Sequence, residues 1–142
     1  MNKKNSNSFL AVSFRSGFVS PNIPIATFSQ GDKDIVFLLD TGSDNNVINK
    51  GALDYVEHEM LEGGDTTTLS GVNGTTEVEH CSIQFSCEED VYKADFLVAD
   101  LNEAFSQIRK GHCITIHGIL GSNFLRNHNV VLDFNNLTAY SK

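Results

Sequence analysis

The sequence IVFLLDTGS at residues 35–43 decides how the rest of the chain can be arranged. Its first five residues are apolar, and a short continuous apolar run predicts a buried strand. Asp40 follows this run directly, and a carboxylate at the end of such a strand is costly to desolvate unless it is hydrogen-bonded or used. Gly42 lets the backbone turn sharply and approach the carboxylate, so that backbone N–H groups and the Ser43 hydroxyl can donate to it. The stretch therefore predicts a purpose-built carboxylate site where a strand ends.

The three residues Asp40-Thr41-Gly42 match the signature of the aspartic proteases. A second motif strengthens the match, because Ile119-Leu120-Gly121 precedes a short predicted helix at residues 122–126 and a predicted strand at residues 130–134. In order, spacing and size, the chain resembles a retropepsin-type subunit from about residue 22 to its C-terminus.

The resemblance implies a mostly β fold, a retropepsin-like closed β-barrel of the acid-protease type with one or two short helices. It assigns residues 22–142 to this domain. Residues 1–21 fall outside it, and we expect a partly disordered segment that can contribute a strand, at residues 9–14, to the domain edge or to a subunit interface.

The hydrophobic and β-branched patterns agree with a fold of many short strands. An Asn-Gly pair at residues 73–74 predicts a hairpin between two of them. A weak helical pattern occurs at residues 52–60, and a clearer one at residues 101–108 has Asp100 as its expected N-cap. The predicted strands lie at residues 23–28, 35–39, 46–49, 66–71, 75–86, 91–98, 114–120, 129–134 and 137–140.

Composition limits the possible partners. A chain of 142 residues forms one domain, and its formal net charge of −8 argues against nucleic acid, which requires a basic face. The same charge disfavours an anionic membrane surface, and no apolar run approaches the roughly 20 residues of a membrane span. We expect neither nucleic acid nor membrane as a partner.

Three cysteines, Cys81, Cys87 and Cys113, lack Cys-x-x-Cys spacing. This predicts reduced thiols, mostly buried in strands, and a cytoplasmic location. His112, Cys113 and His117 are too loosely spaced to favour a metal over surface or core roles. The sequence predicts no metal and no cofactor.

Only one Asp-Thr-Gly motif is present, since the nearest imitation, Asp65-Thr66-Thr67, lacks the glycine. Hydrolysis of a peptide by an activated water requires an acid and a base, and two carboxyl groups that share one proton supply both. The second carboxylate must then come from a second copy, with a two-fold axis between Asp40 and its equivalent. This chemistry predicts a homodimer that acts on an extended peptide or protein.

The resemblance also implies roles for the neighbouring residues. Thr41 would interlock with its mate beneath the carboxylates, Gly42 would offer backbone donors near the substrate, and Ser43 would hydrogen-bond the outer carboxylate oxygen. Ile119, Leu120 and Gly121 would pack behind the active loop. A flap that closes over the substrate would be formed by Gly71, Val72, Asn73 and Gly74.

Two features depart from the viral pattern. Viral members usually have an arginine after the glycine that corresponds to Gly121, paired with an acid near the signature, whereas this chain has Ser122. Asp44 is therefore either free to contact substrate or simply solvated. In addition, residues 101–112 are longer than the viral pattern, which can alter the edges of the pocket.

The sequence thus favours a homodimeric aspartic endopeptidase. The alternative is a non-catalytic dimer of the same fold that binds peptides or proteins, because a fold does not guarantee an activity. A third possibility is an intact catalytic pair that stays inactive until residues 1–21 are removed.

Overall fold

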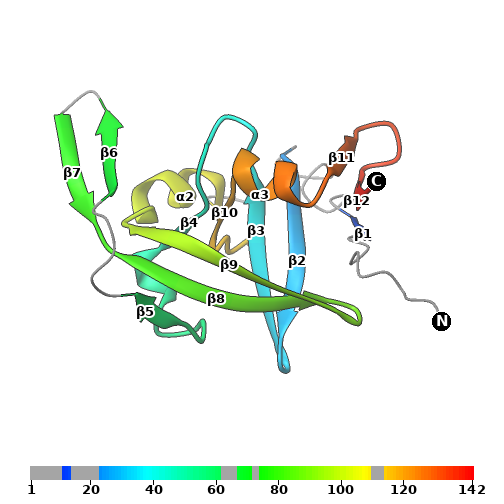
Figure 1. Ribbon diagram of the computed structural model, residues 1–142, viewed down its shortest axis with the longest axis horizontal. Helices are drawn as coiled ribbons and strands as arrows, with labels where there is room; N and C mark the ends of the chain where they lie inside the picture. Colours follow the sequence, from blue (N-terminus) through cyan, green and yellow to red (C-terminus); the bar gives the residue numbers. More distant parts are fainter. Residues whose placement is uncertain (1–10, 14–22, 62–66, 72–73, 110–113) are drawn as a thin grey trace.

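The structure is a computed structural model, and it describes residues 11–13, 23–61, 67–71, 74–109 and 114–142. The described part is mostly β, as predicted, with two α-helices and one 3-10 helix (Figure 1). The helices are η1 (Lys50–Ala52), α2 (Asn102–Arg109) and α3 (Ser122–Asn127). The strands are β1 (Ala11–Ser13), β2 (Ile25–Gln30), β3 (Lys33–Leu39), β4 (Val47–Asn49), β5 (Glu59–Leu61), β6 (Thr67–Gly71), β7 (Gly74–Val78), β8 (His80–Cys87), β9 (Asp90–Ala99), β10 (Gly118–Leu120), β11 (Val130–Asp133) and β12 (Thr138–Ser141).

Six strands close into a barrel in the order β2-β3-β10-β4-β9-β8. The closing contact is the pairing of β2 with β8, through Ser29 opposite Ser86. Strand β5 continues the sheet beyond β8, and β6 and β7 form a separate two-stranded hairpin that projects from one end (Figure 1). The predicted closed barrel of the retropepsin type is therefore confirmed.

The barrel interior is filled by alternate residues of its strands. On β3, Ile35, Phe37 and Leu39 are all buried. The Phe37 ring centroid lies 5.2 Å from that of Phe85 on β8 and 5.4 Å from that of Phe96 on β9. The first contact is edge-to-face and the second is stacked, and aromatic contacts at these distances add to the free energy gained from burial.

The other face of β3 is also covered, which explains why its sequence is apolar without alternation. Val36 and Leu38 pack with Phe105 of α2 in a second, smaller apolar cluster. Helix α2 begins one residue later than predicted, so Leu101 and not Asp100 is the N-cap position, since the Leu101 carbonyl accepts from the Phe105 N–H (2.8 Å). Asp100 still accepts a hydrogen bond from the N–H of the first helical residue, Asn102 (3.0 Å). Helix α2 thus partly covers the outer face of β3, where Val36 and Leu38 are half-buried.

The prediction of a helix at residues 52–60 is wrong. The chain makes η1 and a short turn to Val56, whose N–H donates to the Ala52 carbonyl, and then enters strand β5. Val56 is buried, but Met60 is 40% exposed and pairs with Cys81 in the sheet. Pairing with β8 replaces the helical hydrogen bonds that the sequence pattern favoured.

Two predicted strands have different limits. The strand predicted at residues 75–86 is divided into β7 and β8 at Glu79, whose carbonyl accepts from the N–H of Val98 (2.9 Å), because the chain leaves the hairpin there and joins the barrel. The strand predicted at residues 114–120 is reduced to β10, which occupies residues 118–120.

The N-terminal strand β1 pairs with β12 of the same chain, and β12 pairs with β11. β1 corresponds to the middle of the strand predicted at residues 9–14, and the other residues of that prediction lie outside the described residues. The C-terminal hairpin turns at residues 134–137, as predicted. No helix in the described part is long and apolar enough to span a membrane.

Candidate active site

Asp40 begins the loop of residues 40–46 between β3 and β4, which we call the active loop. β3 runs parallel to β10 with Leu39 opposite Leu120, and the Asp40 N–H donates to the Leu120 carbonyl at 3.0 Å. Strand β10 also pairs with β4, where Ile119 lies opposite Val47. Main-chain pairing on both sides of β10 therefore fixes where the active loop starts and ends.

The Asp40 carboxylate, which is half-buried, points back into its own loop. The Asp40 Oδ1 accepts from the N–H of Gly42 at 2.9 Å, and the main-chain carbonyl of Asp40 accepts from the N–H of Ser43 at 3.2 Å. A Cβ atom at position 42 would lie 3.2 Å from Asp40 Oδ1, tighter than an ordinary contact. Glycine thus allows the backbone donor to reach the carboxylate, as the sequence argument required.

Ser43 does not have the contact that the resemblance implied. Its hydroxyl donates to the Asn45 carbonyl at 2.7 Å, not to the Asp40 carboxylate. The backbone N–H of Gly42 already occupies the inner side of that carboxylate, and the tight loop places the Asn45 carbonyl closer to the serine. Within one chain, Ser43 therefore stabilises the loop rather than the charge.

Gly121 lies directly behind the active loop. A Cβ atom there would lie 2.6 Å from the Ser43 carbonyl oxygen and would also collide with the Asn45 carbonyl. Its φ of −93° is open to any residue, so the requirement for glycine is one of space. Leu120 is fully buried in the barrel core, and Ile119 is half-buried against the apolar cluster that contains Phe105.

The first residues of α3 hold the middle of the active loop. The Ser122 N–H donates to the Ser43 carbonyl at 2.7 Å, and the Asn123 N–H donates to the Asp44 carbonyl at 3.0 Å. These N–H groups belong to the first turn of a helix, where no intrahelical partner exists. Two main-chain bonds thus fix the loop where Ser122 replaces the arginine usual in viral members.

Asn46 is a site residue that the sequence analysis missed. Its side chain is buried; Oδ1 accepts from the Gly121 N–H (2.9 Å) and Nδ2 donates to the Asp95 carbonyl (3.1 Å). Its own carbonyl accepts from the Leu97 N–H (2.9 Å). One residue therefore ties the active loop to both β10 and β9. An asparagine at the start of an apolar strand was the only available sequence signal.

Thr41 and Asp44 are exposed on the outer side of the active loop. Among the residues that the structure describes, their side chains have no hydrogen-bond or ion-pair partner. Gly71 and Gly74 pair at the end of the β6–β7 hairpin, while Val72 and Asn73 lie outside the described residues. The hairpin predicted from Asn-Gly is present, and its role as a flap stays a prediction.

His117, one of the residues considered as a metal ligand, lies against an aromatic ring and a backbone N–H instead. His117 stacks on Tyr55 with 5.0 Å between ring centroids, and its Nδ1 accepts from the Val36 N–H at 2.9 Å. Burial lowers the pKa of His117, which favours the neutral ring that this hydrogen bond requires. His112 and Cys113 lie outside the described residues, and no metal-binding cluster of three or more ligands occurs in the described ranges.

Comparison with known proteins decides the family. A sequence model described as aspartyl protease matches residues 26–124, which include the active loop and Gly121. The chain belongs to the aspartyl protease family. Membership of this family supports a peptide-hydrolase function. No curated protein matches the sequence at a significant level.

A solved structure agrees with the aspartyl protease assignment. The EIAV protease complexed with the inhibitor HBY-793 is similar to this chain with a TM-score of 0.51 and 23% sequence identity. The likeness covers 81% of this chain and 96% of that chain, so it spans nearly the whole of the EIAV protease chain. It shows that this aspartyl protease family member has the retropepsin fold.

Proposed function

We propose that the protein is a homodimeric aspartic endopeptidase in which Asp40 of each subunit forms the catalytic pair. The observation that carries the proposal is the position of this carboxylate: it ends a sandwiched strand, is only half-buried, and accepts a backbone N–H from Gly42. Family membership sets the reaction class, and the single Asp-Thr-Gly motif requires the second carboxylate to come from a second copy.

The reaction requires one ionised and one protonated carboxyl group. The ionised carboxylate takes a proton from water as the water oxygen attacks the peptide carbonyl carbon, and the protonated one gives its proton to the carbonyl oxygen. When the resulting gem-diol collapses, the C–N bond breaks and the leaving nitrogen takes up a proton. Two carboxyl groups so close together are not easily ionised at the same time, because their negative charges repel, so one stays protonated while the other is ionised.

The remaining parts of the site would serve binding. The β6–β7 hairpin would close over an extended peptide and pair with its backbone, as strand-adding recognition sites do. Exposed Thr41 would interlock with its equivalent across the two-fold axis, and exposed Asp44 would lie at the edge of the cleft. A second candidate function, a non-catalytic peptide-binding dimer, differs only in the environment of the two carboxylates.

Cleavage of an unbiased peptide library by wild type and Asp40→Asn tests the proposal. We expect wild type to cut with a bell-shaped rate profile between about pH 4 and 7, and the variant to lose at least about a thousandfold in rate. Asp44→Asn is the matched control, because it removes an exposed carboxylate from the same loop. It should keep the reaction and change at most the preference for substrate residues.

Mixed dimers separate the two functions further. Co-refolding wild type with an excess of Asp40→Asn should inhibit cleavage, because each mixed dimer has only one catalytic carboxylate. If sedimentation shows a stable dimer that binds library peptides but neither wild type nor variant cleaves them, the binding module replaces the protease. A monomer that cleaves peptides would contradict the shared pair.

A further inference from the structure

Strand β8 pairs with β9 along one edge over its whole length, but its other edge lacks a strand partner over part of its length. β5 pairs with it from Glu59 opposite Ser82 to Leu61 opposite His80, and β2 pairs with it only at Ser86. In the same register Glu57, two residues before Glu59, would lie opposite Gln84, but β5 begins only at Glu59. The sheet therefore has a gap on the side where β2 and β5 should meet β8.

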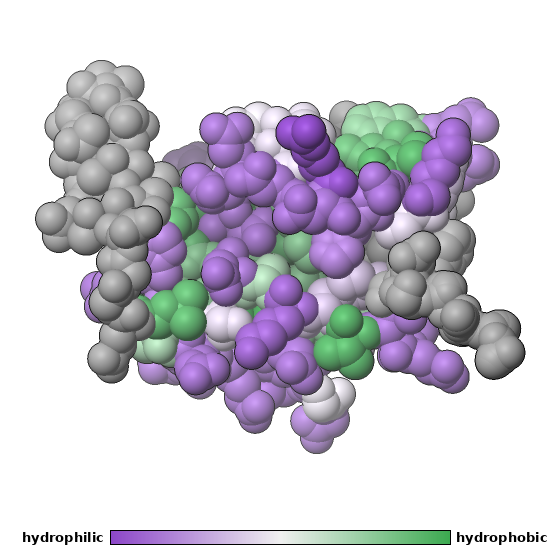
Figure 2. Space-filling model, viewed as in Figure 1, coloured by the Kyte–Doolittle hydropathy of each residue, from purple (hydrophilic) through white to green (hydrophobic). Residues whose placement is uncertain are grey.

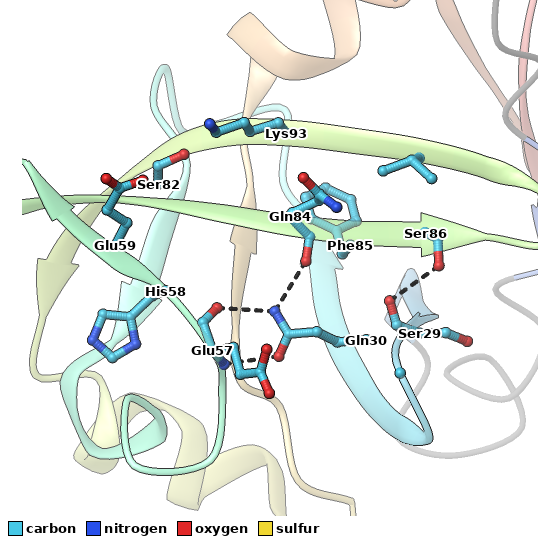
Figure 3. Close-up of a pocket in the computed structure, with 12 residues that line it drawn as sticks. Ser29, Gln30, Glu57, His58, Glu59, Ser82, Gln84, Phe85, Ser86 and Lys93 are labelled. Atoms are coloured by element: carbon cyan, nitrogen blue, oxygen red, sulfur yellow. Dashed lines mark hydrogen bonds between the residues drawn. The ribbon is translucent and has the colours of Figure 1, made fainter.

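The side chain of Gln30 fills this gap (Figure 3). Its Nε2 donates to the Glu57 carbonyl and to the Gln84 carbonyl, each at 2.9 Å, and its Oε1 accepts from the Glu57 N–H at 2.8 Å. One carboxamide thus makes three hydrogen bonds to main chain and imitates a peptide group between two strands. Each amide hydrogen has its own acceptor, so the donors are fully used.

The two segments that Gln30 joins are the two supports of the β6–β7 hairpin. Glu57 precedes β5, which leads into β6, and Gln84 lies on β8, which follows β7. The hairpin stands at the far end of these supports in Figure 1. Its position relative to the barrel therefore depends on how the two supports are held together. Main-chain pairing of β5 with β8 holds them next to the hairpin, and Gln30 continues this connection beyond the end of the pairing.

Neighbouring side chains hold the same segment. We call residues 55–57 the strap. Lys33 Nζ donates to the Tyr55 carbonyl at 2.7 Å, and the Tyr55 hydroxyl donates to the Asp34 carbonyl at 3.0 Å. Lys33 also lies 5.3 Å from the centre of the Tyr55 ring. The end of the β2–β3 hairpin thus holds the strap through side chains, and only Gln30 reaches β8 as well.

The surface around Gln30 is hydrophilic. A hollow of about 460 Å³ lies here, lined mainly by polar residues of β2, β5, β8, β9 and the strap, including Ser29, Glu59, Ser82 and Lys93. Figure 2 shows that this face of the molecule is mainly hydrophilic, with only small separate apolar areas. Water therefore competes for the Gln30 hydrogen bonds, which makes them reversible.

We propose that Gln30 is a positioning residue that couples both supports of the β6–β7 hairpin and so controls how the hairpin closes over a peptide. The inference rests on the proposed protease function, since closure matters only if a peptide is bound there. Gln30 does not touch the reacting atoms, and it acts through the strap and β8. Its effect should appear mainly in substrate binding rather than in the chemical step.

Gln30→Glu is the sharpest variant, because it keeps shape and acceptor and removes both donors. The carboxylate would face the carbonyls of Glu57 and Gln84 without a hydrogen between them. Amide hydrogen exchange of the main chain in β6 and β7 should become about tenfold faster, as expected for a weakened local anchor. Amides of β3 and β10 should be unchanged and serve as the internal reference.

The matched control is Gln107→Glu, the same chemical change on an exposed position of α2. It should leave exchange in the hairpin unchanged. Below about pH 4 the introduced glutamate in Gln30→Glu becomes protonated and can donate one hydrogen bond, so the exchange difference should shrink. Gln30→Asn, which is too short to reach both carbonyls, should show the exchange defect at every pH.

Kinetics provide the second readout. For Gln30→Glu we expect KM for a peptide substrate to rise about fivefold to tenfold with kcat within about twofold of wild type, the pattern of lost binding rather than lost chemistry. A residue that only stabilises the fold would lower the fraction of active protein and leave KM unchanged.

The two proposals can fail separately. If both Gln30 variants leave hairpin exchange and KM as in wild type, the positioning role is overturned even though the protease functions. If wild type cleaves nothing while Gln30→Glu still accelerates exchange in β6 and β7, the coupling stands, the link to catalysis is overturned, and the proposed function fails on its own test.

Discussion

The active loop and the strap are both irregular segments against the same barrel, but they are held in different ways. The active loop is held by main-chain groups of β10 and α3 and by one buried side chain, Asn46. The strap has local main-chain bonds to the Ala52 carbonyl and one buried side chain, Val56, but its connection to the β2–β3 hairpin depends on three exposed or half-buried side chains, those of Gln30, Lys33 and Tyr55. Main-chain anchors keep a catalytic group in one place, whereas solvent-exposed side-chain anchors open and close at little cost in free energy.

The largest expected effect tests the rigid half of this comparison. Gly121→Ala should destabilise the protein by about 3 kcal/mol and abolish activity, because the new methyl group collides with two carbonyls of the active loop. Urea denaturation and peptide cleavage measure it. Gly31→Ala is the control: its φ of +64° is strained for alanine but the space is open, so it should cost about 1 kcal/mol and keep activity. Equal losses from the two variants would refute the steric argument.

The next effect tests whether one buried side chain carries the loop. Asn46→Ala should cost about 2 kcal/mol of stability, since it leaves the Gly121 N–H and the Asp95 carbonyl without their partner in a buried site. The exposed neighbour offers a matched variant, Asn45→Ala, for which we expect less than about 0.5 kcal/mol. Chemical denaturation of both, followed by cleavage assays, measures the difference. Comparable losses would mean that the main-chain bonds alone hold the loop.

A smaller effect tests the adjustable half. Tyr55→Phe removes the hydroxyl donor to the Asp34 carbonyl and keeps the ring, so we expect a loss of about 0.5 to 1 kcal/mol. Thermal unfolding gives the stability, and exchange of the Glu57 amide reports on the strap. If Tyr55→Phe disturbs the active loop as much as the strap, the two regions are not independent and the comparison fails.

The smallest effect concerns pH and a residue that contacts the strap. Burial lowers the pKa of His117, so the unfolded chain takes up a proton more readily than the folded one. The stability from the neutral ring is complete above about pH 6.5 and declines as the pH falls below it. The Tyr55 ring stacks on His117, and Lys33 lies over the Tyr55 ring. Neither side chain brings a negative charge that would raise the pKa of His117.

His117→Gln should therefore flatten the decline of the free energy of unfolding between about pH 6.5 and 5. Burial also lowers the pKa of His128, so part of the slope should persist. Denaturant titrations at several pH values measure both curves. An unchanged slope in the variant would show that His117 does not contribute.

The resemblance predicted the barrel, and local patterns predicted the strand that delivers Asp40 and the hairpin at the Asn-Gly pair. The local pattern failed at residues 52–60, where Leu53, Val56 and Met60 have helical spacing. The structure uses Val56 as a single core contact and places Met60 in β5, since the segment is shaped by pairing with β8 and by hydrogen bonds from Gln30, more than twenty residues away. Such long-range side-chain anchors leave no periodic signal in the sequence.

The same reason explains the outcome at the candidate site. Asp40, Gly42 and Gly121 could be identified because their motif is contiguous and its geometry is local. Asn46 could not, since its value depends on Gly121 and Asp95, which lie 75 and 49 positions away. Ser43 was assigned to the carboxylate by resemblance, and the tight turn of this chain gave its hydroxyl the Asn45 carbonyl instead.

The bonds between the active loop and β10 also set an order in time. The loop is made from residues 40–46, but its main-chain partners lie at Leu120, Ser122 and Asn123, near the end of the domain. Contacts so distant in sequence form late, because the chain between them must first be closed into a loop. A nascent chain on the ribosome cannot complete the carboxylate site until almost the whole domain has been synthesised. In the proposed protease, topology would therefore prevent premature hydrolysis by a partly made chain, even before two subunits pair.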